Sequence, residues 1–237
     1  MKHYFVFSDI HGNLKPLVDA LDQKGFDLEN ENHILISLGD NFDRGIENID
    51  VLGFLKYFNR LNRLIMIRGN HDDFLLDFLT GKSDGLFNIK HNGLGNTLRE
   101  FSDPNAKTIE EIRDSINRRY PFLIELLESM VPKFELGKYE FIHAGYEYSN
   151  EKDWYIYNFA NTPYFIKYFK PYDKTYVFGH FHVQALNYYE LGKESDEPFR
   201  KKGFIGVDAK TIITKKVNVL VFDENGNEIE GGLKNGN

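Results

Sequence analysis

Five apolar runs of this chain each end in a cluster of aspartate, asparagine or histidine side chains, and this recurrence constrains the fold most strongly. Three runs span His3–Asp9, His33–Asp40 and Arg63–Asn70, and two later ones end at His143 and His180. A single aspartate before a turn is commonly a turn residue or a helix cap. Five such ends indicate one shared site, because ligands bind beyond the carboxyl ends of the strands in open α/β sheets.

The spacing of apolar residues predicts a helix after each of the first three runs. These helices are expected over Leu14–Lys24, Ile46–Leu61 and His71–Thr80, with glycines at positions 25 and 81 ending the first and third. Three successive strand–loop–helix units indicate parallel strands joined by right-handed crossovers, and therefore an α/β fold.

The middle of the chain departs from this alternation. Lys82–Arg99 is polar and rich in glycine, and we expect a loop there. Thr108–Met130 has a helical pattern that Pro121 should interrupt. We interpret residues 82–130 as a helical insertion over the sheet, within a single domain that covers residues 1–237. The insertion could be a lid, a docking surface or a dimer contact.

The last part of the chain returns to short strands. A hairpin turn is expected at Gly137-Lys138, and further strands at TYVF, GFIGV and VNVLVF, before the tight reversal ENGN. Glu147–Asp173 is rich in Tyr, Phe and Asn and has weak periodicity, which fits short helices or a substrate-facing surface. Aromatic side chains of Trp154–Tyr172 could stack on a base, or could pack in the core.

Composition excludes several classes of protein. The chain has 237 residues, 41% of them hydrophobic and 15% aromatic, which argues against disorder. A net charge of -7 argues against a broad nucleic-acid-binding surface. No run is long and apolar enough for a signal peptide or a transmembrane helix, so we expect no membrane partner and a cytoplasmic location.

The clusters at the strand ends offer oxygen and imidazole nitrogen as ligand atoms, and the chain has no cysteine. This donor set suits Mn, Fe or Zn and excludes a thiolate site. In two-metal hydrolases the ions lie about 3.5–4 Å apart and share a bridging oxygen. Asp40, central in the predicted sheet, is the natural bridging carboxylate, because two dications would neutralise its buried charge.

The motifs SDIHGN, GDNFDRG, RGNHD, HAG and GHFHV resemble, in order and spacing, the motif set of the calcineurin-like metallophosphoesterases. The resemblance covers roughly Met1–Asp208, and GDNFDRG and RGNHD are similar to the phosphoprotein phosphatase branch, which includes bacterial and phage serine/threonine phosphatases. It implies two mixed β-sheets packed face to face with helices outside, the four-layer α/β/β/α sandwich of the metallophosphatase fold. It also implies two divalent metal ions as cofactors, with Mn favoured over Fe or Zn.

The resemblance assigns metal-binding roles to matching residues. Asp40 would bridge the two ions. The remaining ligands would be Asp9 and His11 for the first ion, and Asn70, His143 and His180 for the second. His182 is expected to bind the first ion directly or to support one of its ligands, as the second histidine of GHFH does in phosphodiesterase branches; alternatively its ring stacks on neighbours such as Phe181.

The resemblance also implies a catalytic set. His71 would be the general acid, oriented by Asp43, while Arg44 and Arg68 would hold the phosphoryl oxygens in a phosphate site shared with Asn70 and His71. A hydroxide between two dications could attack phosphorus in line. Two guanidinium forks suit the phosphoryl oxygens, and a cationic imidazole could protonate the poor leaving group of a phosphoserine.

Two departures from the family pattern affect these expectations. Asp72 stands where the family commonly has glutamate, which is a mild change. The chain also has no arginine from Ala144 to Gly179, where the family commonly supplies a third phosphate-binding arginine. Lys152 or Lys167 could substitute, although a lysine lacks the bidentate fork.

Three functions fit the sequence. The leading one is a two-metal serine/threonine phosphoprotein phosphatase, whose partner is a phosphoprotein or a phosphorylated small molecule. The alternative is a nucleotide phosphoesterase, such as a dinucleoside tetraphosphatase or a cyclic-nucleotide phosphodiesterase, which the GHFH motif favours slightly. A non-catalytic binding module on the same fold is a further alternative, disfavoured because every expected ligand is present. The oligomeric state stays open.

Overall fold

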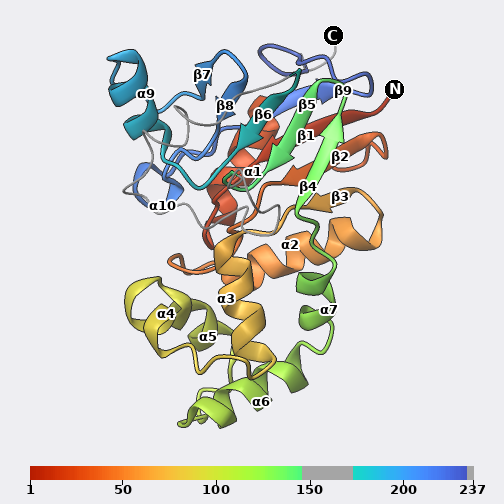
Figure 1. Ribbon diagram of the computed structural model, residues 1–237. Helices are drawn as coiled ribbons and strands as arrows, with labels where there is room; N and C mark the ends of the chain where they lie inside the picture. Colours follow the sequence, from red (N-terminus) through yellow and green to blue (C-terminus); the bar gives the residue numbers. More distant parts are fainter. Residues whose placement is uncertain (146–172, 234–237) are drawn as a thin grey trace.

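The computed structural model describes residues 1–145 and 173–233, with two sheets at one end of the molecule and a group of helices at the other (Figure 1). The first sheet has the order β3-β2-β1-β9. Its strands are β1 (His3–Phe7), β2 (His33–Ser37), β3 (Leu64–Met66) and β9 (Leu220–Asp223). The first three are parallel and β9 is antiparallel to β1, which confirms the predicted strand–helix units.

The second sheet has the order β4-β5-β6-β8-β7. Its strands are β4 (Lys133–Leu136), β5 (Tyr139–Ile142), β6 (Thr175–Phe178), β7 (Phe199–Lys201) and β8 (Phe204–Gly206). Strands β5, β6 and β8 run parallel, whereas β4 and β7 are antiparallel edge strands. Strands β4 and β5 form the hairpin expected at Gly137-Lys138. Both sheets are therefore mixed, as predicted.

Alternating side chains divide the core into layers. In β1, Phe5 and Phe7 pack with the helices α1 (Leu14–Gln23) and α2 (Asn48–Arg60), while Val6 faces the second sheet. In β5, Phe141 lies between the sheets, and the next residue, Ile142, packs with α9 (Val183–Leu191). This period of two places helices outside both sheets and confirms the four-layer sandwich.

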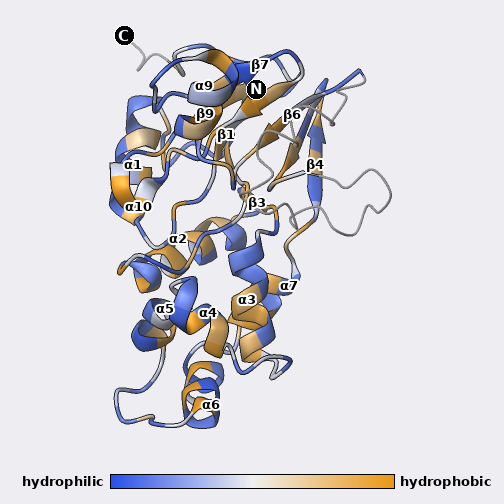
Figure 2. Cartoon of the chain, turned by 60° about the vertical axis from the view of Figure 1, so that its left-hand side comes forward, coloured by the Kyte–Doolittle hydropathy of each residue, from blue (hydrophilic) through white to orange (hydrophobic). Residues whose placement is uncertain are grey.

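The insertion consists of four helices that follow α3 (Asn70–Leu79). They are α4 (Leu86–His91), α5 (Leu94–Phe101), α6 (Ile109–Arg119) and α7 (Leu123–Glu128). The break between α6 and α7 contains Pro121, as predicted. The expected loop over Lys82–Arg99 is wrong, because this segment forms α4 and most of α5. In Figure 2 the helices of the insertion carry both hydrophobic and hydrophilic stretches, the mark of amphipathic helices.

The same hydrophobic cluster continues from the first sheet into the insertion, since Leu94, Leu98 and Phe101 of α5 belong to the cluster that contains Phe5. The prediction of one domain over residues 1–237 extends beyond the described residues and stays a prediction. None of the helices in residues 1–145 and 173–233 has the length and apolar character needed to cross a membrane. A short helix, α10 (Thr211–Thr214), precedes β9.

Candidate active site

Loops at the carboxyl ends of five strands, from both sheets, bring the predicted site residues together. Each strand contributes to the group in chain order: Asp9 and His11 follow β1; Asp40, Asp43 and Arg44 follow β2; Asn70 and His71 follow β3 and open α3; His143 follows β5; His180 and His182 follow β6. The sandwich therefore places the motifs where ligands bind in α/β sheets.

The backbone at these loops has an uncommon conformation. Positive φ angles occur at six predicted site residues, namely Asp9 (51°), His11 (43°), Asp40 (55°), Asp43 (73°), Arg44 (60°) and His180 (58°). Residues with side chains rarely adopt such angles, and each must be held by surrounding contacts. Part of that support comes from hydrogen bonds between the strand-end loops themselves. The His71 N–H donates to Asp40 Oδ1 (2.9 Å), and the His11 N–H donates to the Asp40 carbonyl (3.1 Å).

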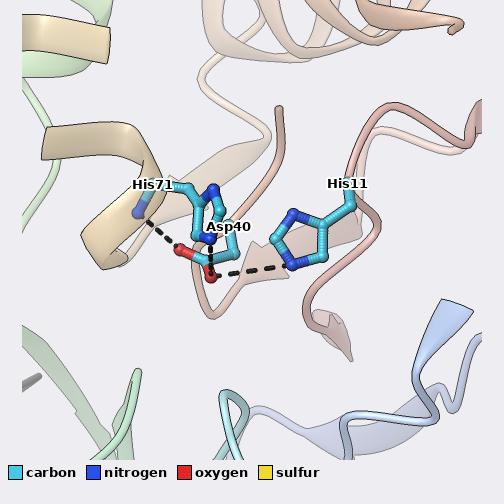
Figure 3. Close-up of side chains that lie close together, drawn as sticks. All are labelled: His11, Asp40 and His71. Carbon is cyan, nitrogen blue, oxygen red and sulfur yellow. Dashed lines mark hydrogen bonds and ion pairs between the residues drawn. The ribbon is translucent and has the colours of Figure 1, made fainter. Parts of the chain in front are cut away.

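Asp40 lies at the centre of the predicted metal ligands. Figure 3 shows its carboxylate between the rings of His11 and His71, whose Nε2 atoms lie 3.7 and 3.9 Å from Asp40 Oδ2. The other oxygen, Oδ1, lies 3.5 Å from His143 Nε2. Two groups able to hold a cation thus share Asp40: one with His11 and His71, the other with His143 and His180. Such a shared carboxylate is what a bridging ligand requires.

Asp9 and Asn70 adjoin these two groups. One oxygen of Asp9, Oδ1, lies 4.0 Å from His11 Nε2, while Oδ2 accepts hydrogen bonds from the Ser8 hydroxyl and from the His180 N–H (2.9 Å). The Asn70 Oδ1 lies 3.2 Å from His143 Nε2. The structure therefore gathers all six predicted ligands other than His182 around one point.

The charges in this cluster suit divalent cations. Burial raises the pKa of Asp9, and burial together with the neighbouring Asp9 and Asp72 raises the pKa of Asp40 well above its usual range. Burial, followed by the neighbouring His71 and Arg44, lowers the pKa of His11 well below the usual value. Crowded carboxylates beside neutral imidazoles are unfavourable by themselves, but they are the donors that Mn, Fe or Zn prefers. The donor set therefore fits the predicted metals.

His71 and Asp43 form a buried dyad beside the cluster. The His71 Nδ1 lies 2.7 Å from Asp43 Oδ2, and both side chains are almost fully buried. Burial raises the pKa of Asp43 to about 7, opposed by a hydrogen bond from Thr97 and by Arg44. Burial, Arg44 and His143 lower the pKa of His71 well below its usual value. Asp43 is thus placed to orient the His71 ring, as predicted for a general acid.

The Arg44 guanidinium spans the two imidazoles. Its Nη2 lies 3.0 Å from His71 Nε2, and its Nη1 lies 3.1 Å from His11 Nε2. Because arginine only donates, each Nε2 acts as an acceptor here, and His71 carries its proton on Nδ1 facing Asp43. The predicted phosphate ligand Arg44 therefore lies directly beside the nitrogen predicted to protonate the leaving group.

Arg68 lies apart from this group. Its Nη2 donates to the carbonyls of Glu128 (3.3 Å) and Met130 (3.2 Å), and its Nε lies 3.6 Å from Asp73 Oδ1. The guanidinium is thus directed towards the insertion and, within residues 1–145 and 173–233, makes no hydrogen bond to the cluster. Its role in phosphate binding stays a prediction that requires the side chain to exchange these contacts.

His182 immediately precedes α9 as its N-cap residue, and its Nε2 lies 3.8 Å from Asp208 Oδ2. Burial, Lys210 and Arg44 lower the pKa of His182 to about 4, which leaves a neutral ring. Neither of the two cation-binding groups in the described part of the chain contains His182. Its contact with the first metal therefore stays a prediction.

Sequence reasoning missed two buried carboxylates that support the site. Asp72 was interpreted only as a replacement for the family's glutamate, yet its Oδ2 accepts hydrogen bonds from the N–H groups of Asp40 and Gly69, both at 2.9 Å. Asp208 follows β8, and burial and the neighbouring Asp9 raise its pKa well above the usual range. The signal for Asp208 was present, because it is another carboxylate directly after an apolar run.

The other predicted features lie outside the described residues. These are the aromatic segment Trp154–Tyr172 and the lysines proposed to replace a third arginine, Lys152 and Lys167.

Comparisons with known proteins identify the family of this chain and several relatives. The calcineurin-like phosphoesterase family model matches residues 3–204. Serine/threonine-protein phosphatase 2 of Salmonella typhimurium is 28% identical over 152 residues, which cover 64% of this chain and 65% of that protein. The asymmetrical bis(5'-nucleosyl)-tetraphosphatase PrpE of Anoxybacillus flavithermus is 28% identical over 123 residues, covering 49% of each chain.

A solved structure shares the whole fold. The crystal structure of a putative diadenosine tetraphosphatase superposes with a TM-score of 0.62 at 17% identity, covering 96% of this chain and 92% of that one. At this identity the likeness concerns the fold alone. This chain spans less than two thirds of the two curated relatives above, so their activities do not transfer to it directly. The match over residues 3–204, together with the motifs and the fold, shows that the chain belongs to the calcineurin-like phosphoesterase family.

Proposed function

We propose that this chain is a metal-dependent phosphomonoesterase that acts on phosphoserine or phosphothreonine in proteins. The observation that carries the proposal is the buried Asp43–His71 dyad, whose outer nitrogen faces Arg44 beside the Asp40 cluster. This arrangement supplies an acid for the leaving group next to a cation for the phosphoryl oxygens. Family membership and the phosphatase names of curated relatives support the same activity.

The cluster around Asp40 would hold two divalent ions. Asp40 would bridge them, because its two oxygens face different imidazoles. The other ligands in this proposal are Asp9, His11, Asn70, His143 and His180, with His182 beside the first ion, and Mn is the favoured metal. When bound, such ions lower the pKa of a water molecule and offset the charge of the phosphoryl group.

His71 would deliver the proton to the leaving alkoxide through Nε2. In its neutral form the ring keeps a proton on Nδ1, and Asp43 stabilises the cation formed when Nε2 is also protonated. In this structure Arg44 directs its N–H groups at the two imidazoles. The oxygens of a bound phosphoryl group would accept these hydrogen bonds instead, and His71 Nε2 would then be available to the leaving oxygen. Asn70 would line the same pocket, and Arg68 would join it after leaving its contacts with the insertion.

A second candidate function is hydrolysis of nucleotide esters or anhydrides. Two curated relatives are named asymmetrical bis(5'-nucleosyl)-tetraphosphatases, and a putative diadenosine tetraphosphatase has the same fold. The GHFH motif, in which His182 faces Asp208, also slightly favours phosphodiester substrates. We favour the phosphomonoesterase because GDNFDRG resembles the phosphoprotein phosphatase branch, whereas the residue at the position of Asp43, which holds His71 in this structure, is usually replaced in the dinucleotide branch.

The experiment that tests the proposal compares three substrates with Mn added. A phosphoserine peptide should be hydrolysed faster than diadenosine tetraphosphate and faster than bis(p-nitrophenyl) phosphate. The His71→Asn variant, measured for bound metal, is the matched control for contaminating phosphatase. Preference for a diester or a dinucleotide would contradict the phosphomonoesterase. Full activity after exhaustive chelation would contradict metal dependence, and a chain that carries no metal and hydrolyses none of the substrates would be a binding module.

A further inference from the structure

Helix α5 of the insertion reaches the catalytic dyad through Thr97. The Thr97 side chain is fully buried, and its hydroxyl donates a hydrogen bond to Asp43 Oδ1 at 2.7 Å. The Thr97 hydroxyl oxygen also accepts a hydrogen bond from the Asp43 N–H at 2.9 Å. Because Asp43 Oδ2 is bonded to His71, the carboxylate is held at both oxygens, and its plane cannot rotate without losing one bond.

The same segment also holds the backbone of Arg44. The carbonyl of Gly93 accepts a hydrogen bond from the Arg44 N–H at 3.2 Å, and the Asn96 side-chain amide donates to the Arg44 carbonyl at 2.7 Å. Gly93 has a φ of 84°, and a Cβ there would lie 2.7 Å from the Arg44 nitrogen, too close for any side chain. Gly93 therefore allows the two backbones to meet.

These contacts fall where the backbone most needs support. Asp43 and Arg44 are consecutive residues with positive φ, at 73° and 60°. Each residue in such a backbone conformation costs about 1–3 kcal/mol of folding free energy, and the conformation persists only where neighbouring residues hold it. Both residues lie in the loop between β2 and α2, where the regular hydrogen bonds of a strand or helix do not hold them, although Asn48 at the start of α2 accepts from the Asp43 N–H. The insertion fixes this loop from outside.

A second anchor joins α5 to the end of the same loop. The Asn48 side chain accepts a hydrogen bond from the Asp43 N–H at 3.0 Å and donates to Glu100 Oε1 at 2.5 Å. Glu100 also accepts the Ile49 N–H, at 3.2 Å, at the start of α2. Helix α5 thus contacts the loop at its beginning and at its end, and a lid motion of α5 would break all of these bonds.

We propose that residues Gly93–Thr97 of the insertion are positioning residues for catalysis: Thr97 fixes Asp43 and through it the acid His71, while Asn96 fixes the backbone that carries Arg44. This inference rests on the proposed phosphoesterase function. It assigns the insertion a part in building the site, where the sequence left a lid, a docking surface and a dimer contact open.

The two contacts predict different kinetic defects. Thr97→Val keeps the shape and removes the hydroxyl, so kcat on a phosphoserine peptide should fall about 10- to 100-fold, which is less than the ~10²–10⁴-fold expected when the general acid itself is lost. The loss on p-nitrophenyl phosphate, whose leaving group needs little protonation, should be several-fold smaller. Thr97→Ser should restore most of the activity on the peptide. Asn96→Leu should instead raise KM and weaken inhibition by inorganic phosphate, with the ratio between the substrates unchanged.

Ser115→Ala is the matched control. Ser115 is a buried residue of the insertion, and its hydroxyl accepts from the Asp103 N–H (3.0 Å) and donates to the Ile112 carbonyl (2.9 Å), away from the dyad. Its removal should lower the melting temperature without changing the substrate ratio. Equal losses of Thr97→Val on both substrates, or a change of ratio in Ser115→Ala, would overturn the proposal.

A measurement without turnover separates this inference from the proposed function. In the wild-type protein and in Thr97→Ser, proton NMR should show a downfield ring N–H signal from His71 Nδ1, identified by its absence in His71→Asn. In Thr97→Val the signal should broaden or vanish, because the Asp43 carboxylate is free to rotate. An unchanged signal would overturn the inference even in an active enzyme. If the wild-type protein hydrolysed none of the substrates, the proposed function alone would fail.

Discussion

Replacing Asp43 with asparagine should slow hydrolysis of phosphoserine substrates without disturbing the fold. Asparagine has the same shape, so its oxygen can still accept from His71 Nδ1, and its amide can donate to the Thr97 hydroxyl. What disappears is the negative charge 2.7 Å from the imidazole. The variant therefore tests the charge of Asp43 separately from its geometry.

The size of the effect follows from that hydrogen bond. A hydrogen bond to a charged group contributes about 1.5–3 kcal/mol, and about 1.4 kcal/mol corresponds to a tenfold change in an equilibrium. Losing the charge should therefore reduce the protonated fraction of His71 by about 10- to 150-fold. Burial and Arg44 already lower the pKa of His71, so this variant moves it further from neutral pH. The kcat on a phosphoserine peptide should fall in the same proportion.

The assay compares kcat/KM for a phosphoserine peptide and for p-nitrophenyl phosphate at the same Mn concentration. The second substrate should lose much less activity, because its leaving group departs without a proton. Bound metal and the melting temperature should match the wild-type protein, which shows that only the dyad has changed. An equal loss on both substrates would mean that His71 does not act as the acid, and wild-type activity on the peptide would refute the role of the charge.

Four further changes have distinct expected results. Asp40→Asn should lose bound metal and activity together, measured by elemental analysis and turnover, because it weakens the bridging ligand. His71→Asn should keep its metal but lose about 10²–10⁴-fold in kcat on the peptide. Asp72→Ala should destabilise the protein by about 2–6 kcal/mol in urea unfolding, because two buried N–H groups lose their acceptor. Metal affinity measured by calorimetry should weaken as the pH falls, since burial raises the pKa of Asp9 and Asp40 and protons then compete for these carboxylates.

The strand-end motifs were predictable because each is local. An apolar run followed by Asp, Asn or His defines both the strand and its functional end, and parallel strands necessarily bring those ends together. For this reason Asp40, His143 and His180, far apart in the sequence, were expected at one point and lie there. Asp208 carries the same signal after β8, so reading every strand end in the same way would have found it.

The insertion was harder to interpret because its signals are short. In α5, Leu94, Leu98 and Phe101 have helical spacing, yet Gly95 and polar residues between them make the segment resemble a loop. Thr97 could not be assigned from sequence, since its partner Asp43 is 54 positions away. The orientation of the Arg68 side chain could not be predicted from the sequence either, because a long side chain can turn either to the site or to nearby carbonyls.

The loop after β2 explains why a site of this kind needs structure from elsewhere in the chain. Its motif must place a bridging carboxylate at Asp40, a dyad partner at Asp43 and a guanidinium at Arg44 within five residues. It does so only by giving all three a positive φ, which neither a helix nor a strand can stabilise. Asp72 holds the first of these residues and the Gly93–Thr97 segment holds the other two. The local motif therefore supplies the chemical groups of the candidate site, whereas their exact placement depends on residues elsewhere in the chain: Asp72 in a later motif and the Gly93–Thr97 segment of the insertion.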